Sequence, residues 1–280
     1  MCGWGGVGLA VTPAAYRSGM RTAVSLPPFT DVATLVDMAA EAEDAGWDGV
    51  FVWDHLVWVR ELRLDVADPW VLLGAVAART ERVMLGTLVT PLARRRPWVV
   101  AKQLITLDHL SGGRAVFGAG LGEPPDADFA AFGDPADARQ RAAVLDDGLA
   151  LLDGLLRGPV DHHGPHFGVT AELRPRPVQD PRPPIWIAAV APHRRGLARA
   201  LRWDGLVPIG MPSGYLTPDE LAAYVEGIDA PSRWDIVASW APGVPADEYV
   251  SVRATWLVEG AWPEGDWVAD LRSRIRHGPA

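Results

Sequence analysis

Short apolar runs alternate with longer amphipathic runs along most of this 280-residue sequence. Such alternation is typical of βα units, in which a buried parallel strand is followed by the helix that covers it. Eight apolar runs predict strands, at 22–26, 49–53, 83–89, 115–119, 185–189, 205–209, 235–240 and 254–259. A predicted helix follows each of them, so the sequence predicts the α/β class and a single closed (β/α)8 barrel, the TIM barrel.

Several helix boundaries carry local signals. Asp31, Asp68, Asp137 and Thr217 each precede an amphipathic run, where a side-chain oxygen can cap free backbone N–H groups. Pro192 is expected to open a short basic helix after the fifth strand. The Pro-, His- and Gly-rich segment 158–184 predicts a long surface excursion with a small hairpin.

An open doubly wound sheet is the alternative architecture. It would normally carry a Gly-rich phosphate turn after its first strand. Residues 26–30 read LPPFT and contain no glycine, which favours the barrel.

Composition limits the classes of function. A formal net charge of −9 disfavours nucleic acid and anionic lipid as partners. No apolar run reaches the roughly 18 residues that span a bilayer. Cys2 is the only cysteine, which excludes an internal disulfide and a Cys-rich metal site, so we expect a reducing cytoplasm. Residues 1–19 are Gly-rich and nearly uncharged and read poorly as a signal peptide, so we expect a flexible extension before a barrel domain at 20–280.

Active sites of β/α barrels lie at the C-terminal ends of the strands, which selects the candidate residues. His55 follows the second strand and is the best acid/base candidate, although a loop-capping role has about even odds. Glu123 follows glycines at alternate positions and is either a proton donor or a surface acid. Asp54 is expected to hold a loop or to orient His55. Trp53, Trp58 and Trp240 either wall a pocket or fill the core.

Two further clusters have competing interpretations. One is a run of three arginines, Arg94, Arg95 and Arg96. It either binds an anion or is exposed to solvent at the start of a helix. His162, His163 and His166 lie in the Pro-rich excursion, where a solvated loop is favoured over a metal site. We therefore predict no metal.

Several segments resemble the bacterial luciferase-like oxidoreductases. They are WDGVFVWDHL at 47–56, the block at 68–122 that ends in GAGLG, and the region 183–208 that begins PPIWIAAV. The similarity covers most of the chain after Met20, is most specific over 32–122 and weakens after Asp219.

The resemblance implies a barrel that is usually dimeric and binds FMN or the deazaflavin coenzyme F420 at its C-terminal mouth. It implies acid/base work for His55 and Glu123, and a non-proline cis peptide at Thr87–Leu88 against the ring. The implied cofactor-binding residues are Trp53, Asp54, Thr87, Leu88, Gly120, Gly122, Val190 and Ala191; the implied substrate-pocket residues are Trp58, Trp240 and Glu259. Ala188 and Ala189 replace glycines that are common in the family, and Trp58 lies one position earlier than a family tryptophan. The chain is also short, which predicts an open pocket.

Three functions follow from these features. The first is an oxidoreductase that transfers a hydride between coenzyme F420 and a small organic substrate. The second is an FMN-dependent monooxygenase that receives reduced flavin from a partner reductase and uses O2. The third is a barrel that binds flavin without turnover.

Overall fold

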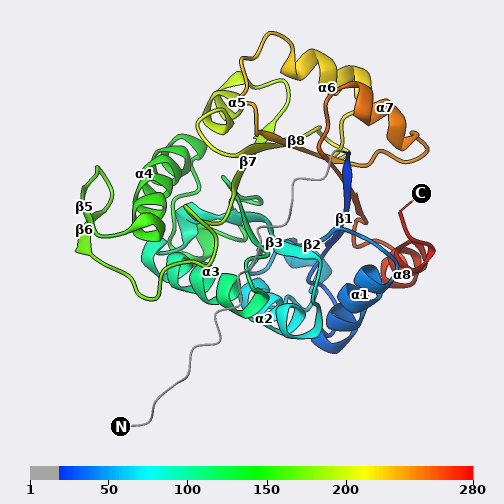
Figure 1. Cartoon of the computed structure of the whole chain (residues 1–280), viewed down its shortest axis with the longest axis horizontal. Helices are drawn as coiled ribbons and strands as arrows, with labels where there is room; N and C mark the ends of the chain where they lie inside the picture. Colours follow the sequence, from blue (N-terminus) through cyan, green and yellow to red (C-terminus); the bar gives the residue numbers. More distant parts are fainter. Residues whose placement is uncertain (1–18, 280) are drawn as a thin grey trace.

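A closed ring of eight parallel strands forms the centre of the molecule (Figure 1). The computed structural model describes residues 19–279. Its barrel strands are β1 (Arg21–Leu26), β2 (Gly49–Val52), β3 (Met84–Pro91), β4 (Ala115–Gly120), β7 (Ile185–Val190), β8 (Gly205–Ile209), β9 (Asp235–Ser239) and β10 (Trp256–Gly260). Pairing of β1 with β10, from Arg21 opposite Trp256 onward, closes the ring. The predicted TIM barrel is confirmed, and the open sheet is excluded.

Helices cover the outside of the ring in chain order. They are α1 (Val32–Asp44), α2 (Pro69–Arg79), α3 (Pro97–Ser111), α4 (Ala138–Arg157), α5 (Arg194–Ala200), α6 (Pro218–Val225), α7 (Ala246–Ser251) and α8 (Trp267–His277). The four predicted caps are confirmed, because the side chains of Asp31, Asp68, Asp137 and Thr217 accept N–H groups of the first helical turn. α5 begins two residues later than predicted, because His193 rather than Pro192 takes the N-cap position.

The excursion between β4 and β7 carries the predicted hairpin. β5 (Val160–His163) pairs antiparallel with β6 (Gly168–Ala171) beside α4 (Figure 1). Asp147 of α4 accepts hydrogen bonds from the backbone N–H groups of His166 and Phe167, which anchors the hairpin turn.

Two apolar layers form the core. Inside the ring, Phe51, Trp186 and Trp256 meet edge to face, with ring centroids 5.4 to 5.8 Å apart. The other layer lies between the strands and the helices and includes Leu35, Leu73 and Leu152. Part of the tryptophan content is therefore core, as one of the two interpretations predicted.

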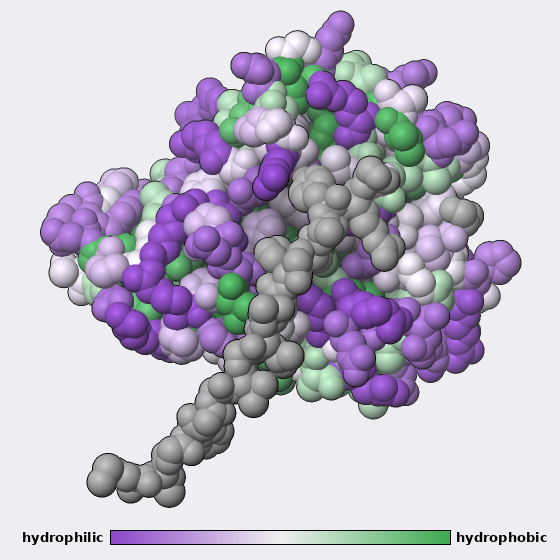
Figure 2. All heavy atoms as spheres, viewed as in Figure 1, coloured by the Kyte–Doolittle hydropathy of each residue, from purple (hydrophilic) through white to green (hydrophobic). Residues whose placement is uncertain are grey.

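Hydrophilic side chains cover most of the face seen in Figure 2, with apolar residues in small patches. Between residues 19 and 279, no helix is both long and apolar enough to cross a membrane. The expected extension at 1–19 falls almost wholly outside the described residues.

Candidate functional site

A cavity of about 1210 Å³ opens at the C-terminal mouth of the barrel. Its lining includes Trp53, Leu88, Val89, Ile209, Ser239 and Trp240. Leu88 and Val89 also pack on the apolar layer inside the ring, so they form part of the cavity floor. The cavity is thus built where the barrel rule predicts a site.

The floor contains a bulge in β3. The register of β3 on β4 shifts between Thr87 and Thr90, and the peptide bond Leu88–Val89 is cis. The expected non-proline cis bond therefore exists, one residue later than Thr87–Leu88.

Glycines of β4 make room for this bulge. A Cβ at Gly118 would lie 2.2 Å from the carbonyl oxygen of Thr87, and one at Gly120 would lie 2.6 Å from Val89 Cγ2. Gly122 has φ +80°, and a Cβ there would lie 2.5 Å from Pro91 Cβ. The chain's own packing therefore requires a glycine at each of these three positions.

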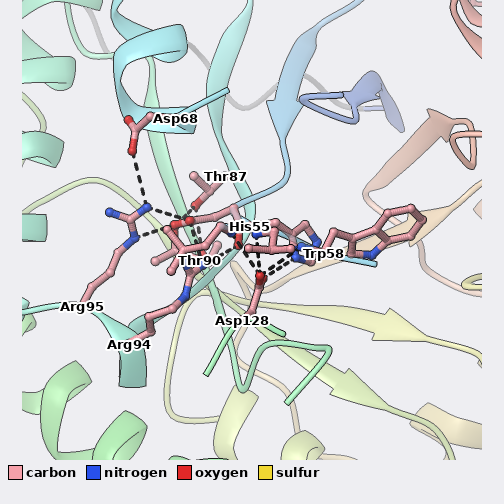
Figure 3. A network of polar contacts seen from close by, with 12 residues as sticks. His55, Trp58, Asp68, Thr87, Thr90, Arg94, Arg95 and Asp128 are labelled. Atoms are coloured by element: carbon pink, nitrogen blue, oxygen red, sulfur yellow. Dashed lines mark hydrogen bonds and ion pairs between the residues drawn. The ribbon is translucent and has the colours of Figure 1, made fainter. Parts of the chain in front are cut away.

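His55 forms a pair with Asp128, a residue 73 positions away in the sequence. The distance from His55 Nδ1 to Asp128 Oδ2 is 2.8 Å, and the Asp128 side chain is only 1% exposed. The other oxygen, Oδ1, accepts the backbone N–H groups of Leu56, Val57 and Trp58 at 2.8 to 3.2 Å (Figure 3). Asp128 therefore fixes both the imidazole and the turn that follows it.

The charge on Asp128 determines the tautomer of His55. Burial opposes ionisation, but the hydrogen bonds from His55, Val57 and Trp58 outweigh it and lower the pKa of Asp128 from 3.8 to about 2. An ionised carboxylate only accepts hydrogen bonds, so His55 Nδ1 carries a hydrogen. Nε2 has no partner among residues 19–279 and is the atom free to exchange a proton.

Aromatic rings surround His55. Phe29 stacks on Trp58 at 4.9 Å between ring centroids, and Trp53 meets Trp262 edge to face at 5.5 Å. The His55 ring lies 6.1 Å from Trp53 and 6.2 Å from Trp58. His55 is thus joined to the cavity through Trp53, which lines it.

The Trp58 backbone has φ 61°, a left-handed conformation that is costly for a bulky residue. The hydrogen bond from its N–H to Asp128 holds the turn in this form. The Trp58 side chain stacks on Phe29 and lies 6.2 Å from His55, but it is not among the residues that line the cavity.

Asp54 lies at the centre of a buried polar network, whose members Thr90, Arg94 and Arg95 are labelled in Figure 3. Its carboxylate accepts hydrogen bonds from Thr90 Oγ1 at 2.8 Å, from Arg94 at 3.1 Å and, bidentately, from Arg95 at 2.7 Å to each oxygen. Both carboxylate oxygens therefore have cationic partners, and Asp54 joins the end of β2 to the segment after β3. This supports the loop-holding interpretation of Asp54 and gives Arg94 and Arg95 a partner other than an external anion.

Thr87 belongs to the same network. It is fully buried, and its hydroxyl oxygen lies 3.1 Å from Gly118 O and 3.0 Å from Thr90 Oγ1. Its side chain therefore lies in the β3–β4 wall, which corrects the expectation that Thr87 meets a ring at the rim.

Glu123 lies apart from the other predicted acid/base group. Its side chain is 74% exposed and lies 3.4 Å from Arg141, whose guanidinium also donates to the carbonyls of Leu121 and Gly122. The side chain is therefore solvated, which favours the surface-acid interpretation of Glu123.

The remaining predicted residues divide between the mouth and its margins. Trp240 lines the cavity, with its indole N–H donating to Val244 O at 2.8 Å. Glu259 lines the cavity where it reaches α8 and forms an ion pair with Arg274. Val190 is 36% exposed at the end of β7, and Ala191 lines a second cavity of about 630 Å³ beside α6.

The three histidines of the hairpin region do not form a metal site in the described part of the chain. His162 Nε2 lies 2.8 Å from Asp147 Oδ1, and His163 lies 3.1 Å from the exposed Asp161. No group of three metal-ligating side chains occurs among residues 19–279. Arg96, the third arginine of its run, lies over the Trp98 ring at 5.6 Å.

Comparison with known protein families identifies the family of this chain. The family model described as luciferase-like monooxygenase matches residues 9–241. The chain belongs to this family. A luciferase-like relative named F420-dependent glucose-6-phosphate dehydrogenase, from Nakamurella multipartita, is 34% identical over 229 residues, which are 80% of this chain and 65% of the relative. A protein of the same name from Beutenbergia cavernae is 38% identical over 192 residues, 66% of this chain and 55% of the relative.

The chain thus spans less than two thirds of the length of these curated relatives. The chain is also similar to the 4-hydroxyprotoasukamycin monooxygenase of Streptomyces nodosus, with 35% identity over 56% of this chain and 44% of that protein. The solved F420-dependent tetrahydromethanopterin reductase of Methanopyrus kandleri has a TM-score of 0.75 at 17% identity, covering 92% of this chain and 98% of that one. At this identity the likeness supports the luciferase-like fold alone.

The luciferase-like mouth fits a flat tricyclic ring. Leu88 and Val89 give it an apolar floor, and the indoles of Trp53, Trp240 and Trp262 lie around it. Its volume of about 1210 Å³ exceeds the roughly 300–1,000 Å³ of common ligand pockets, so a ring and a substrate have room together.

Sequence reasoning missed two residues of this luciferase-like site. Asp128 is one of several acids in the loop after β4, and nothing local distinguishes it from Asp126 or Asp134. Trp262 follows β10, and its position after a predicted strand was the only available signal.

Proposed function

We propose that this luciferase-like chain is an oxidoreductase that transfers a hydride between coenzyme F420 and a small organic substrate. The observation that carries the proposal is the His55–Asp128 pair beside a tryptophan-walled, apolar mouth. Relatives that are 34% and 38% identical over the aligned residues, and that are named F420-dependent, support the choice of cofactor.

The deazaflavin supplies hydride chemistry at C5 when it is bound. The chain supplies orientation and proton transfer. Asp128 holds the Nδ1–H of His55, so Nε2 of the neutral ring would remove a proton from the substrate, and the imidazolium that results would return a proton from Nε2 when the reaction runs in reverse. Trp53 and Leu88 are the residues proposed to hold the ring, together with Val89 of the floor.

Other predicted residues take supporting roles in this proposal. Asp54 and Thr87 position the mouth by fixing the loop and wall behind it. Gly120 and Gly122 let this wall pack closely, and Ala191 lines the second cavity, next to Val190 at the end of β7. Glu123 remains a second candidate proton donor, and its exposure favours His55 over it.

An FMN-dependent monooxygenase fed by a reductase is the second candidate. The relative named as a monooxygenase from Streptomyces nodosus favours it, as does the fold of the solved monooxygenase RslO1 from Streptomyces bottropensis, which has a TM-score of 0.69 and 20% identity over 92% of this chain and 98% of that one. The same cavity accepts either tricyclic ring, so only the cofactor chosen distinguishes the two functions.

Equilibrium titration of the purified protein with F420 and with FMN tests the proposal. We expect saturable F420 binding with a Kd at least tenfold lower than that of FMN. FMN binding that is tighter, together with oxygen consumption when reduced FMN is supplied, would assign the monooxygenase function instead. Binding of neither cofactor contradicts both.

We also propose a homodimer, from the resemblance to a family that is usually dimeric. Light scattering after gel filtration tests it, and a single monomeric species contradicts it. The cytoplasm remains the proposed location, testable by fractionation of the source organism.

A further inference from the structure

We propose that the substrate is a neutral, largely apolar molecule with a single hydrogen-bonding oxygen held by Ser239, and that sugar phosphates are not substrates. This inference rests on the proposed oxidoreductase function, because it uses the same cavity. It separates this chain from the relatives whose names specify glucose 6-phosphate.

The strands that surround the mouth contribute apolar side chains. Leu88, Val89, Val207, Ile209, Val237 and Val258 line the cavity. Val207, Val237 and Val258 belong to the buried layer inside the ring, so their positions are fixed by core packing. A ligand that enters this region exchanges water for hydrocarbon contact, which favours an apolar body.

Most polar atoms of the lining already have partners within the protein. Ser25 Oγ accepts the indole N–H of Trp53 at 2.8 Å, and Ser213 donates to Tyr215 O at 3.2 Å. The indole N–H of Trp262 donates to Ser213 O at 3.1 Å, and that of Trp240 is bonded to Val244. These groups shape the wall, and only a small part of their hydrogen-bonding capacity is left for a ligand.

The charges of the lining oppose an anionic substrate. Two carboxylates, Asp247 and Glu259, line the cavity with one guanidinium, Arg274, and one imidazole, His277. Arg274 forms an ion pair with Glu259 and donates to Gly260 O at 3.1 Å. Burial raises the pKa of Glu259, while Arg274 opposes this shift.

A phosphate dianion would therefore meet two carboxylates and a single arginine of this lining, whose charge is already paired with Glu259. Removing a charge from water without a dedicated partner is strongly unfavourable. The described part of the mouth thus lacks what a sugar phosphate requires.

Ser239 differs from Ser25 and Ser213, whose polar atoms are already engaged. It is the last residue of β9, lines the cavity and is half-buried, and its hydroxyl has no hydrogen-bond partner among residues 19–279. A hydroxyl both donates and accepts, so it suits the oxygen of a ketone or of the corresponding alcohol.

The test uses the F420-loaded protein and a series of unbranched 2-alkanones from acetone to 2-nonanone, with glucose 6-phosphate as the anionic probe. Calorimetric titration should give a Kd that falls about fourfold for each added methylene until the cavity is full. Glucose 6-phosphate should show no saturable binding.

Substitution of Ser239 identifies the polar contact. Ser239→Ala should weaken binding of 2-heptanone about two- to tenfold and leave binding of the oxygen-free 1-heptene unchanged. Ser251→Ala, which removes a hydroxyl that donates to Glu248 O on α7, is the matched control.

The possible results separate this inference from the proposed function. Failure of F420 to bind removes the proposed function itself. If F420 binds, then saturable glucose 6-phosphate binding, or 2-alkanone affinities that do not depend on chain length, overturns the inference. Equal losses for 2-heptanone and 1-heptene in Ser239→Ala would overturn the assignment of Ser239.

Discussion

The two halves of the barrel differ in how they are covered and in what fills their C-terminal ends. Helices α1 to α4 are 11 to 20 residues long, whereas α5 to α7 are 6 to 8 residues long. In the first half, buried ion pairs and hydrogen bonds around Asp54 and Asp128 fill the space behind the mouth (Figure 3). In the second half, the ends of β8 to β10 border the open cavity.

This difference suggests that the two halves of the barrel have different functions. Buried polar networks hold their members in one geometry, because a buried polar group without a hydrogen-bond partner is costly. Apolar walls accept ligands by shape and area and are less selective. We therefore infer that the first half fixes the reacting groups and the second half selects the substrate, and four changes test that contrast.

Asp128→Asn should have the largest effect. An amide NH2 facing His55 Nδ1 would force that nitrogen to accept, so Nε2 would carry the hydrogen and the wrong tautomer would result. We expect kcat/KM to fall about 10²–10⁴-fold, while the Kd for F420 changes less than threefold. Nitrogen-15 NMR of labelled histidine reports the tautomer directly.

Asp126→Asn is the matched control for this change, because Asp126 is an exposed acid in the same loop. It should leave both activity and tautomer as they are. An unchanged His55 tautomer in Asp128→Asn would refute the role assigned to Asp128.

Asp54→Ala should be the most destabilising change in the first half. It leaves Arg94, whose side chain is 4% exposed, and Arg95 without their carboxylate. Breaking a buried pair in this way typically costs about 3–5 kcal/mol. Urea unfolding followed by tryptophan fluorescence measures the loss, with the exposed Asp65→Ala as control. A loss below about 1 kcal/mol would show that the network contributes little to stability.

Tyr249→Phe tests the second half. The Tyr249 hydroxyl is buried, donates to Leu216 O at 2.8 Å and accepts the N–H of Ala241 at 3.2 Å, so it joins two loops beside the cavity. Removing it should cost about 1–2 kcal/mol. The same unfolding experiment checks this, and a cost equal to that of Asp54→Ala would contradict the contrast between the halves.

Glu41→Gln should have the smallest effect. Glu41 lies on α1, where this helix packs against α8. Hydrogen bonds from Arg272, opposed by burial and reinforced by Arg276, lower the pKa of Glu41 from 4.5 to about 2. A carboxyl with a lowered pKa adds stability above its ordinary pKa and loses it as the pH falls through the folded value. The free energy of unfolding should therefore differ from wild type by about 1 kcal/mol at pH 7.

That difference should shrink between pH 4.5 and 2, the two pKa values of Glu41. Unfolding curves collected across this range measure it, with Glu264→Gln as an exposed control. A difference that stays constant with pH would assign the effect to packing rather than to charge.

Much of the fold was predictable because its signals are local. The caps at Asp31 and Thr217 involve backbone N–H groups three positions away, so the sequence contains the complete motif. The apolar runs that form strands need only a period and a length to be recognised. The start of α5 was misplaced because the proline signal at Pro192 stands outside the helix.

The site was less predictable, because its contacts join distant segments. The sequence selected His55 by its position after β2, but its partner Asp128 lies 73 residues away in an irregular loop. Glu123 was selected by the same rule, yet its side chain is solvated beside Arg141. A strand end gives the position of a residue on the rim and does not give the direction of a side chain in the loop that follows.

The sequence by itself determined the alternation of strands and helices, the closure into a barrel and the rim on which the chemistry is expected. Those features depend on hydrophobic periodicity and on caps within one turn of chain. Only the tertiary structure decided that Asp128 pairs with His55, that Arg94 and Arg95 neutralise Asp54, and that the open half of the mouth is apolar. The physical reason is that hydrogen bonds and buried charges take whichever partner the closed barrel brings within about 3 Å, and distance along the chain does not limit that choice.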